Sequence, residues 1–273
     1  MIRVTIILFG FWLSASTQAT ELPNKPCYVD SAFKRLASDN NLLMFGELHG
    51  TQEMPAYVAS VLCFLSTDIK PIKLGIEYLP DQLPYLIKYI DSSGTRQDKE
   101  ALVFNPYWSA KYQDGRTSQA MFELVDQVRL LRKSGHDVSL FVFDNQLEQN
   151  RDKAMAEMVI AELSKDPDVF HMLITGNIHS QMKKGVPWNS SLETMGTYLS
   201  KLNTKITSVL LTHSGGEAWI CTPDCKTTSL KESKTKTVMI GRLAVAHQNQ
   251  KHDYQIKLGR ITASLPAYQS QSR

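Results

Sequence analysis

Five short runs of mostly apolar residues, separated by segments of helical periodicity, constrain the fold more than any other feature of this sequence. The runs cover residues 42–46, 72–77, 138–143, 169–175 and 206–212. Their length and composition are typical of strands buried on both faces. After the first run, Val58, Val61, Leu62 and Leu65 follow the i, i+3, i+4, i+7 pattern of an amphipathic helix. Strands that alternate with helices predict an α/β fold, in which a mostly parallel sheet is flanked by helices in three layers.

Further helices are expected between the later strands. Apolar residues at helical spacing precede the third strand, where Ser118 can cap the helix and Gly135 can end it. Asn150 can cap a helix over 151–163, and another helix is plausible over 192–202.

Two parts of the chain depart from this alternation. The runs at 238–246 and 254–258 have no helix between them, which predicts an antiparallel edge hairpin near the C-terminus. Residues 80–116 are rich in Pro, Tyr and polar residues and are longer than a simple connection needs, which suggests a helical cap or lid. Residues 264–273 are rich in Ser and Gln and are expected to form a flexible tail.

The first 19 residues have the features of a secretory signal peptide. Arg3 is their only charge, an apolar run covers 6–13, and Thr17-Gln18-Ala19 offers a cleavage site. Cleavage there would leave a chain beginning at Thr20, with one domain over 20–263. No later apolar run approaches the length of about 18 residues that a membrane span needs. We therefore expect an exported, soluble protein of the periplasm or the extracellular space.

The charge balance bears on the partners of the chain. The sequence has 30 Lys and Arg against 27 Asp and Glu, and the predicted signal peptide carries one Arg and no acid, which leaves 29 against 27 and a formal charge of +2. Such a near-neutral balance gives no case for nucleic acid as a partner. A small molecule or a peptide is the expected substrate.

Four cysteines remain after the predicted cleavage. In an oxidising compartment an even number indicates disulfides. We pair Cys221 with Cys225 and, by elimination, Cys27 with Cys63. On the chain-entropy model the longer loop would contribute about 3–4 kcal/mol and the shorter one roughly 2. A cysteine zinc site is the alternative, although no Cys-x-x-Cys pair occurs.

Polar residues follow the predicted strands one after another. The strands run into Gly46-Glu47-Leu48-His49, Glu77, Asp144, Gly176-Asn177-Ile178-His179 and His213-Ser214-Gly215-Gly216. Ligands of open parallel sheets bind beyond the carboxyl ends of the strands, so this edge is the expected active site. Ordinary loop composition explains Asp144 and His213 equally well. It explains the two Gly-x-x-His units less well, which favours a functional pair of His49 and His179.

These motifs resemble a known superfamily. Gly46-Glu47-Leu48-His49, Glu77, Arg151-Asp152-Lys153-Ala154-Met155-Ala156 and Gly176-Asn177-Ile178-His179 resemble, in order and spacing, the superfamily that joins erythromycin esterases, the haem-binding ChaN proteins and the Tiki/TraB group. Residues 47–55, and Trp108 with residues 114–121, look like a secreted bacterial branch of unassigned activity. The resemblance spans about residues 40–215, and because activities diverge within the superfamily it implies the fold more than the function.

The resemblance implies a pocket into which five side chains point: His49, Glu47, Glu77, Arg151 and His179. Histidine is the side chain best suited to act as a base near neutral pH, and neighbouring carboxylates can orient its ring or raise its pKa. Arg151 could stabilise an oxyanion. Both residues also have a structural interpretation. Arg151 could form a salt bridge with Glu148 or Glu47, and Glu77 could be a buried partner of Arg151.

Other residues are candidates for binding substrate or forming a lid. Glu53 shares the helical face of His49 if a helix starts near Thr51, and either a role behind His49 or solvent exposure fits it. Trp108, with Tyr107 and Tyr112, could line a pocket or pack the lid. Arg116 and Asp144 complete this set.

Two functions from different classes follow. The first is a hydrolase of ester or peptide bonds in which a histidine activates water. A divalent metal held by His49, Glu47 and His179 could instead supply the nucleophile, and this donor set would suit zinc, manganese or cobalt. The second is a ChaN-like protein that binds haem for uptake without catalysis. Haem would need an axial Tyr or His on an exposed apolar surface, and Tyr78, Tyr107 and Tyr112 are candidates. No nucleophile elbow, dinucleotide fingerprint or phosphate loop occurs in the sequence.

Overall fold

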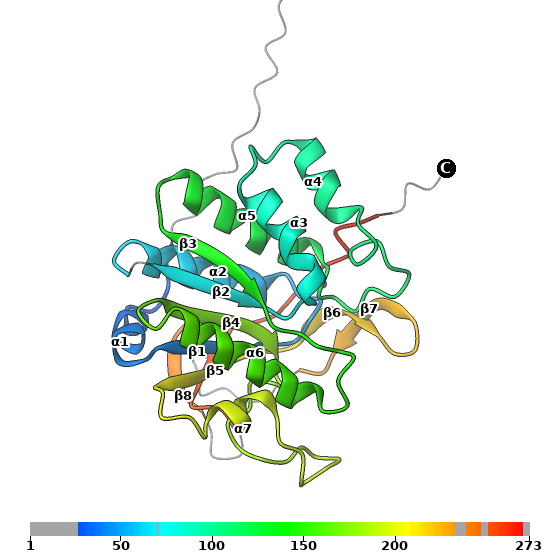
Figure 1. Ribbon diagram of the computed structural model, residues 1–273. Coiled ribbons are helices and arrows are strands. Elements are labelled where there is room, and N and C mark those ends of the chain that lie inside the picture. The colour runs from blue at the N-terminus through cyan, green and yellow to red at the C-terminus, as the bar shows by residue number, and fades with distance from the viewer. Residues whose placement is uncertain (1–26, 70, 233–238, 247–250, 270–273) are drawn as a thin grey trace, which may run out of the picture.

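A seven-stranded sheet forms the centre of the computed structural model, which describes residues 27–69, 71–232, 239–246 and 251–269 (Figure 1). The predicted signal peptide and residues 270–273 of the predicted tail lie outside the described residues. The strand order is β3-β2-β4-β1-β5-β9-β8. The strands are β1 (Leu42–Glu47), β2 (Ile72–Ile76), β3 (Val138–Val142), β4 (Phe170–Gly176), β5 (Ile206–Thr212), β8 (Leu243–Val245) and β9 (Tyr254–Lys257).

The sheet confirms the predicted fold class. Each of the five apolar runs forms a strand, and these strands pair in parallel with their neighbours. At one edge β9 pairs in parallel with β5 and in antiparallel with β8, so the predicted edge hairpin is present.

Helices cover both faces of the sheet, as strands that are apolar along their length require, because successive side chains point to opposite faces. In β1, Leu43 and Phe45 belong to one buried cluster, and Leu42 and Met44 belong to the other. The first cluster lies under α1 (Ala32–Asp39), α2 (Glu53–Ser66), α3 (Leu83–Ile90), α4 (Arg96–Val103) and α5 (Gln119–Lys133). The second lies under α6 (Arg151–Lys165) and α7 (Met195–Leu199).

Side-chain caps set the start of the helices that approach the site. Ser118 accepts a hydrogen bond from the backbone N–H of Met121, and Asn150 accepts one from Lys153, as predicted. Two details differ from expectation. The helix predicted over 192–202 is confined to α7, and α1 was not predicted because its apolar stripe is only two turns long.

The insertion at 80–116 contains a short 3-10 helix (Pro80–Gln82), then α3 and α4, and then a loop. Residues of α3 and α4 belong to the same buried cluster as α5, so these helices extend that layer of the fold. The loop that follows returns to the carboxyl edge of the sheet and carries Asp114 and Arg116 there.

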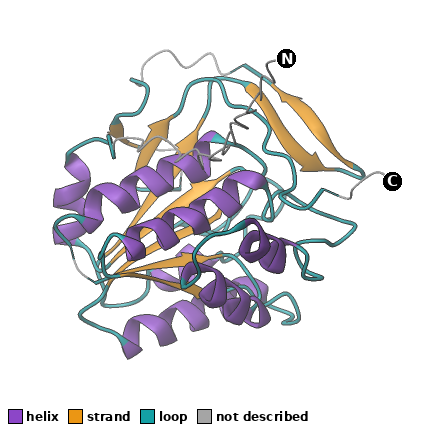
Figure 2. Ribbon diagram, turned by 90° about the horizontal axis from the view of Figure 1, so that it is seen from above, coloured by secondary structure: helices purple, strands orange, loops and turns teal. Residues whose placement is uncertain are grey.

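Both predicted disulfides are present, and no free cysteine occurs in the described residues. Cys27–Cys63 ties the segment before α1 to α2. Cys221–Cys225 closes a separate two-stranded hairpin of β6 (Gly216–Cys221) and β7 (Cys225–Leu230), which was not predicted. Figure 2 shows this hairpin beside the main sheet.

The end of the described chain is held against the domain. Ser118 and Pro266 form a β-bridge, and the backbone N–H of Ala267 donates to Thr117. The predicted flexible tail therefore does not begin at Ser264. Among the described residues, no helix has the length and apolarity needed to cross a membrane.

Candidate functional site

His49 lies just past the end of β1 with its ring oriented by a buried carboxylate. Its Nδ1 lies 2.9 Å from Oε1 of Glu47, the last residue of the strand. Its Nε2 lies 3.7 Å from Oε2 of Glu77, which is beyond hydrogen-bond distance. Burial lowers the pKa of His49, but the hydrogen bond to Glu47 and the charges of both glutamates outweigh it, so the pKa stands above its ordinary value of 6.5.

Glu77 follows β2 and lies at the centre of the site. Its Oε2 accepts hydrogen bonds from Thr175 Oγ1 at 2.6 Å and from the backbone N–H of Gly176 at 2.8 Å. Its Oε1 accepts from Arg151 Nη2 at 2.7 Å. Burial raises the pKa of Glu77, but the charges of the neighbouring histidines and arginines hold it well below its usual range. Glu77 is therefore ionised at neutral pH.

Arg151 and Asp152 begin α6, and both reach His179 at the end of the loop after β4. Arg151 Nη1 lies 3.1 Å from Nε2 of His179, while Asp152 Oδ1 lies 2.7 Å from its Nδ1. Asp152 also accepts from the backbone N–H of Met195 at 2.7 Å. One helix start thus fixes both sides of the His179 ring.

A second arginine comes from the loop of the insertion. Arg116 donates to both carboxylate oxygens of Asp114 through Nε and to Asp144 Oδ2 through Nη1 at 2.9 Å. Asp144, which is fully buried, also accepts from Arg151 Nε at 2.7 Å. Burial raises the pKa of Asp114, but its bonds to Arg116 outweigh this and lower it. Asp144 therefore joins the two arginines into one network.

Seven of these side chains line an open cleft of about 350 Å³ at the carboxyl edge of the sheet: Glu47, His49, Glu77, Asp114, Arg116, Arg151 and His179. Its walls also include Leu48, Ile178, Trp219 and Ile220. Most of the lining comes from loops after β1, β2 and β4, and one wall comes from β6. The predicted edge is thus where the structure places the cleft.

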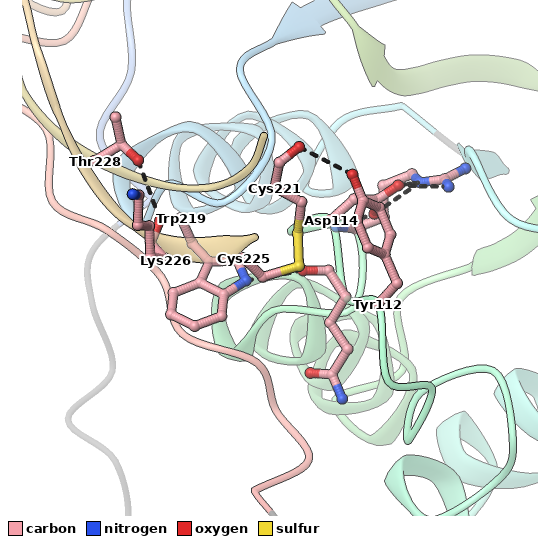
Figure 3. Close-up of a disulfide and its surroundings, with 9 residues drawn as sticks. Tyr112, Asp114, Trp219, Cys221, Cys225, Lys226 and Thr228 are labelled. Carbon is pink, nitrogen blue, oxygen red and sulfur yellow. Dashed lines mark hydrogen bonds and ion pairs between the residues drawn. A yellow bond between two sulfur atoms is a disulfide. The ribbon is translucent and has the colours of Figure 1, made fainter. Parts of the chain in front are cut away.

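The wall from β6 is fastened to the loop that carries Asp114 (Figure 3). Trp219 Nε1 donates to the backbone carbonyl of Gln113 at 2.8 Å, and Tyr112 Oη donates to that of Cys221 at 2.9 Å. The disulfide Cys221–Cys225 lies at the end of the same wall. The hairpin and the loop are therefore held together beside the cleft.

Glycines allow the loops around His49 to approach one another. Gly50 and Gly115 both have positive φ, at 76° and 93°. A Cβ on Gly115 would lie 2.4 Å from the backbone nitrogen of Gly50, so only glycine permits this contact. At Gly176 the absent side chain leaves space inside the site, since a Cβ there would lie 3.2 Å from His49 Nε2 and 3.4 Å from His179 Cδ2.

The structure thus brings together the five residues expected to converge: Glu47, His49, Glu77, Arg151 and His179. Those expected to bind substrate or form a lid are more scattered. Arg116 lines the cleft, while Asp144 lies buried behind it. Trp108 is fully buried and packs edge-on against Tyr78, with ring centroids 5.7 Å apart.

Two further residues lie outside the cleft lining. Glu53 accepts from the backbone N–H of Thr262 at 2.8 Å, so it holds the C-terminal segment. His213 accepts from the backbone N–H of Gly215 at 3.0 Å, in the segment between β5 and β6. Burial lowers the pKa of His213.

The expected metal site does not fit the observed side chains. In the described part of the chain, no group of three or more His, Cys, Asp or Glu side chains is arranged to hold a metal ion. Of the proposed ligands, His49 uses Nδ1 and Glu47 uses Oε1 in their mutual hydrogen bond. His179 Nε2 faces a guanidinium group and its Nδ1 faces Asp152. These side chains therefore do not fit a bound metal ion.

Comparison with solved structures agrees with this architecture. A mutant erythromycin esterase in its open conformation superposes with a TM-score of 0.59 at 13% identity, over 72% of this chain and 78% of that one. The chain has the fold of an erythromycin esterase. A succinoglycan biosynthesis protein (TM-score 0.58, 10% identity, 86% and 91% coverage) and a Bacillus cereus protein (0.57, 9%, 88% and 93%) share the fold. No family model and no curated protein matches the chain by sequence.

This fold was expected from the motif resemblance, but three parts of the site were not. Trp219 lies on a short strand with no apolar run, and Asp114 belongs to the motif at 114–121 but was not singled out within it. Asp152 stands beside Arg151 in the motif. Because a functional histidine needs an acceptor for one of its ring nitrogens, a carboxylate at this position could have been identified as the partner of His179.

Proposed function

We propose that this protein is a hydrolase of ester or peptide bonds in which His49 acts as the general base. The observation that carries the proposal is the state of the His49 ring. Glu47 fixes Nδ1 as the protonated nitrogen, and Nε2 is left facing the cleft with no hydrogen bond within the described residues. General-base catalysis needs a histidine with one ring nitrogen held by a carboxylate and the other open to the reacting group.

In this mechanism a water molecule bound beside Nε2 attacks the substrate carbonyl carbon. As the new C–O bond forms, the water proton passes to Nε2, and the carbonyl oxygen acquires negative charge. The tetrahedral intermediate then collapses: the bond to the leaving alcohol or amine breaks, and protonated His49 returns the proton to that group. The products are a carboxylic acid and an alcohol or amine.

Arg151 is the group best placed to stabilise the oxyanion. A guanidinium carries five N–H donors, and Arg151 directs one each from Nε, Nη1 and Nη2 to Asp144, His179 and Glu77. Two N–H donors remain on a side chain that lines the cleft and is 30% exposed. Donors fixed in advance stabilise a developing charge without reorganisation.

The alternative of haem binding has less support in the geometry. Tyr78 is fully buried and donates to the backbone carbonyl of Arg116, and Tyr112 donates to that of Cys221. Two of the three candidate axial ligands are therefore committed to the domain itself. The cleft lining also includes five charged side chains, from Glu47, Glu77, Asp114, Arg116 and Arg151, whereas haem needs an apolar face.

We further propose that the protein acts outside the cytoplasm, as the two disulfides favour. The test of the hydrolase is a panel of esters and peptides incubated with the mature protein and with His49→Ala. Turnover by the wild type and its loss in the variant are the expected results. Haem titration of the same samples tests the alternative, and stoichiometric haem binding with no turnover would overturn the proposal.

A further inference from the structure

The cleft has an excess of negative charge. Five carboxylates, from Glu47, Glu77, Asp114, Asp144 and Asp152, lie in one network of hydrogen bonds and ion pairs with only two guanidinium groups. The network therefore carries a charge of −3 with both histidines neutral, and −2 when His49 is protonated. No lysine lines the cleft in the described part of the chain.

The two arginines do not offset this excess at the cleft surface. Arg116 is held between Asp114 and Asp144, and its Nη1 lies 3.8 Å from Glu77. Arg151 is held between Asp144 and Glu77. Each positive charge is thus flanked by at least two negative ones, so the net electrostatic potential that a ligand meets in the cleft is negative.

A second observation points to a ligand with hydrogen-bond donors. Glu47 lines the cleft, its side chain is 1% exposed, and its Oε2 has no hydrogen-bond partner among the described residues. An ionised oxygen that is withdrawn from water and left unpaired is unfavourable, and a donor group at this position would relieve the cost.

The remaining wall suits the apolar body of such a ligand. Trp219 lines the cleft, and its indole is held by the hydrogen bond from Nε1 to Gln113 and by the backbone bond from its N–H to Gly50. Indole is the aromatic group that attracts organic cations most strongly. Trp219 is the aromatic residue of this lining and thus offers an apolar surface beside the acidic network.

We propose that the cleft selects substrates that carry a positively charged amine or quaternary ammonium group, and that it discriminates against anionic ones. The inference rests on the proposed hydrolase function and names its substrate class. These substrates share a cation near the carbonyl carbon that is attacked, because His49 and three of the carboxylates, from Glu47, Glu77 and Asp114, line the same cleft.

Three acetate esters of similar size test the selection: one with a quaternary ammonium group, its neutral carbon isostere, and one with a carboxylate. The kcat/KM ratio of ammonium to neutral ester should be about tenfold or more, as expected for a unit charge near several carboxylates, and the anionic ester should be the poorest substrate. Raising the ionic strength should reduce the ratio, because salt screens exposed charges.

Binding without turnover provides an independent readout. Tetramethylammonium and acetate are titrated into the protein while the indole resonance of Trp219 is followed by NMR, with Trp219→Phe used to assign it. Asp114→Asn should weaken tetramethylammonium binding and lower the ammonium-to-neutral ratio, whatever it does to absolute rates. The exposed Glu157, on the outer face of α6, supplies the matched control Glu157→Gln, which should change neither.

The outcomes separate this inference from the hydrolase proposal. Binding of tetramethylammonium with no ester hydrolysed would support the selection and overturn the hydrolase. Hydrolysis of all three esters at equal rates, or tighter binding of acetate than of tetramethylammonium, would overturn the selection and leave the hydrolase standing.

Discussion

Arg151 Nη1 lies 3.1 Å from Nε2 of His179, and this contact decides which histidine can act as a base. A guanidinium group only donates hydrogen bonds, so Nε2 of His179 must be the unprotonated nitrogen. Its proton then lies on Nδ1, which donates to Asp152. Both nitrogens of His179 are committed, whereas His49 keeps Nε2 for the cleft. His49 and His179 are therefore not equivalent, although the sequence presents them in similar motifs.

Removal of His49 should abolish most of the turnover. His49→Ala should lower kcat by about 10²-fold or more, the size expected for the loss of general-base catalysis. His213→Ala is the matched control, because this histidine also follows a strand but lies outside the cleft, and it should cost less than about tenfold. Melting temperatures check the folding of both variants, and equal losses from the two would contradict the assignment of the base.

The pH dependence should report the raised pKa of His49. A base works when it is unprotonated, so kcat/KM should increase with pH through a midpoint above 6.5. Glu47→Gln removes a carboxylate that favours the protonated ring, so it should shift this midpoint to lower pH. The pH profile of both proteins on one ester is the measurement. An unchanged midpoint would show that Glu47 does not control the His49 ring.

Asp152 should act on catalysis through His179. Asp152→Ala removes the acceptor for Nδ1 and should lower kcat by about 10- to 100-fold, the cost that loss of a ring-orienting partner has elsewhere. Asp152→Asn retains an oxygen that can accept the same hydrogen bond and should restore most of the activity. If the two variants were equally impaired at equal stability, a charge effect would replace the orienting role.

Acid should destabilise the protein through Glu77. Its pKa is lowered in the folded state, so its contribution to stability is present above its ordinary value of 4.5 and is lost as the pH falls below that value. The wild type should therefore lose more unfolding free energy between about pH 5 and 3 than Glu77→Gln does. Urea unfolding across this range is the measurement, with the exposed Glu157→Gln as control. Parallel losses in wild type and Glu77→Gln would place the acid sensitivity elsewhere.

The hairpin disulfide should matter for binding more than for chemistry. In the double variant Cys221→Ser, Cys225→Ser the end of the hairpin beside the cleft loses its covalent closure, so KM should rise several-fold while kcat changes little. The stability cost should be about 2 kcal/mol, because the closed loop is short. Cys27→Ser, Cys63→Ser is the matched comparison: it should cost about 3–4 kcal/mol and leave KM unchanged. A larger KM effect from that second pair would contradict the role of the hairpin.

The sequence predicted those parts of the fold that follow from local patterns. The five parallel strands are continuous apolar runs, and Ser118 and Asn150 cap the helices where a side-chain oxygen precedes an apolar periodicity. Glu47, His49 and Glu77 could be placed at one edge because parallel strands end together.

The remaining parts depend on contacts between segments distant in sequence. Asp114 reaches the site because Gly115 lets its loop touch Gly50, and no local pattern encodes that approach. The hairpin of β6 and β7 is short and largely polar, so its strands lack the apolar signal of the main sheet. Its turn at Thr222-Pro223-Asp224 between two cysteines was the available clue. Trp108, which looked like a lid residue, is buried because Tyr78 and the helices of the insertion enclose it.

The attachment of the cleft to the sheet has a consequence for how its selectivity can change. Glu47, His49, Glu77 and His179 lie at or just after the ends of β1, β2 and β4, and these strands are buried and paired along their length. The floor of the cleft is therefore rigid. The wall from β6 belongs to a separate two-stranded unit that is held beside this floor by a few hydrogen bonds, and its disulfide closes the unit on itself. Selection on new substrates can therefore replace single residues of the wall while the floor of the cleft stays intact. A library confined to Trp219, Ile220 and the loop at 112–113 should yield altered substrate range at nearly constant stability, which makes this hairpin the natural starting point for engineering.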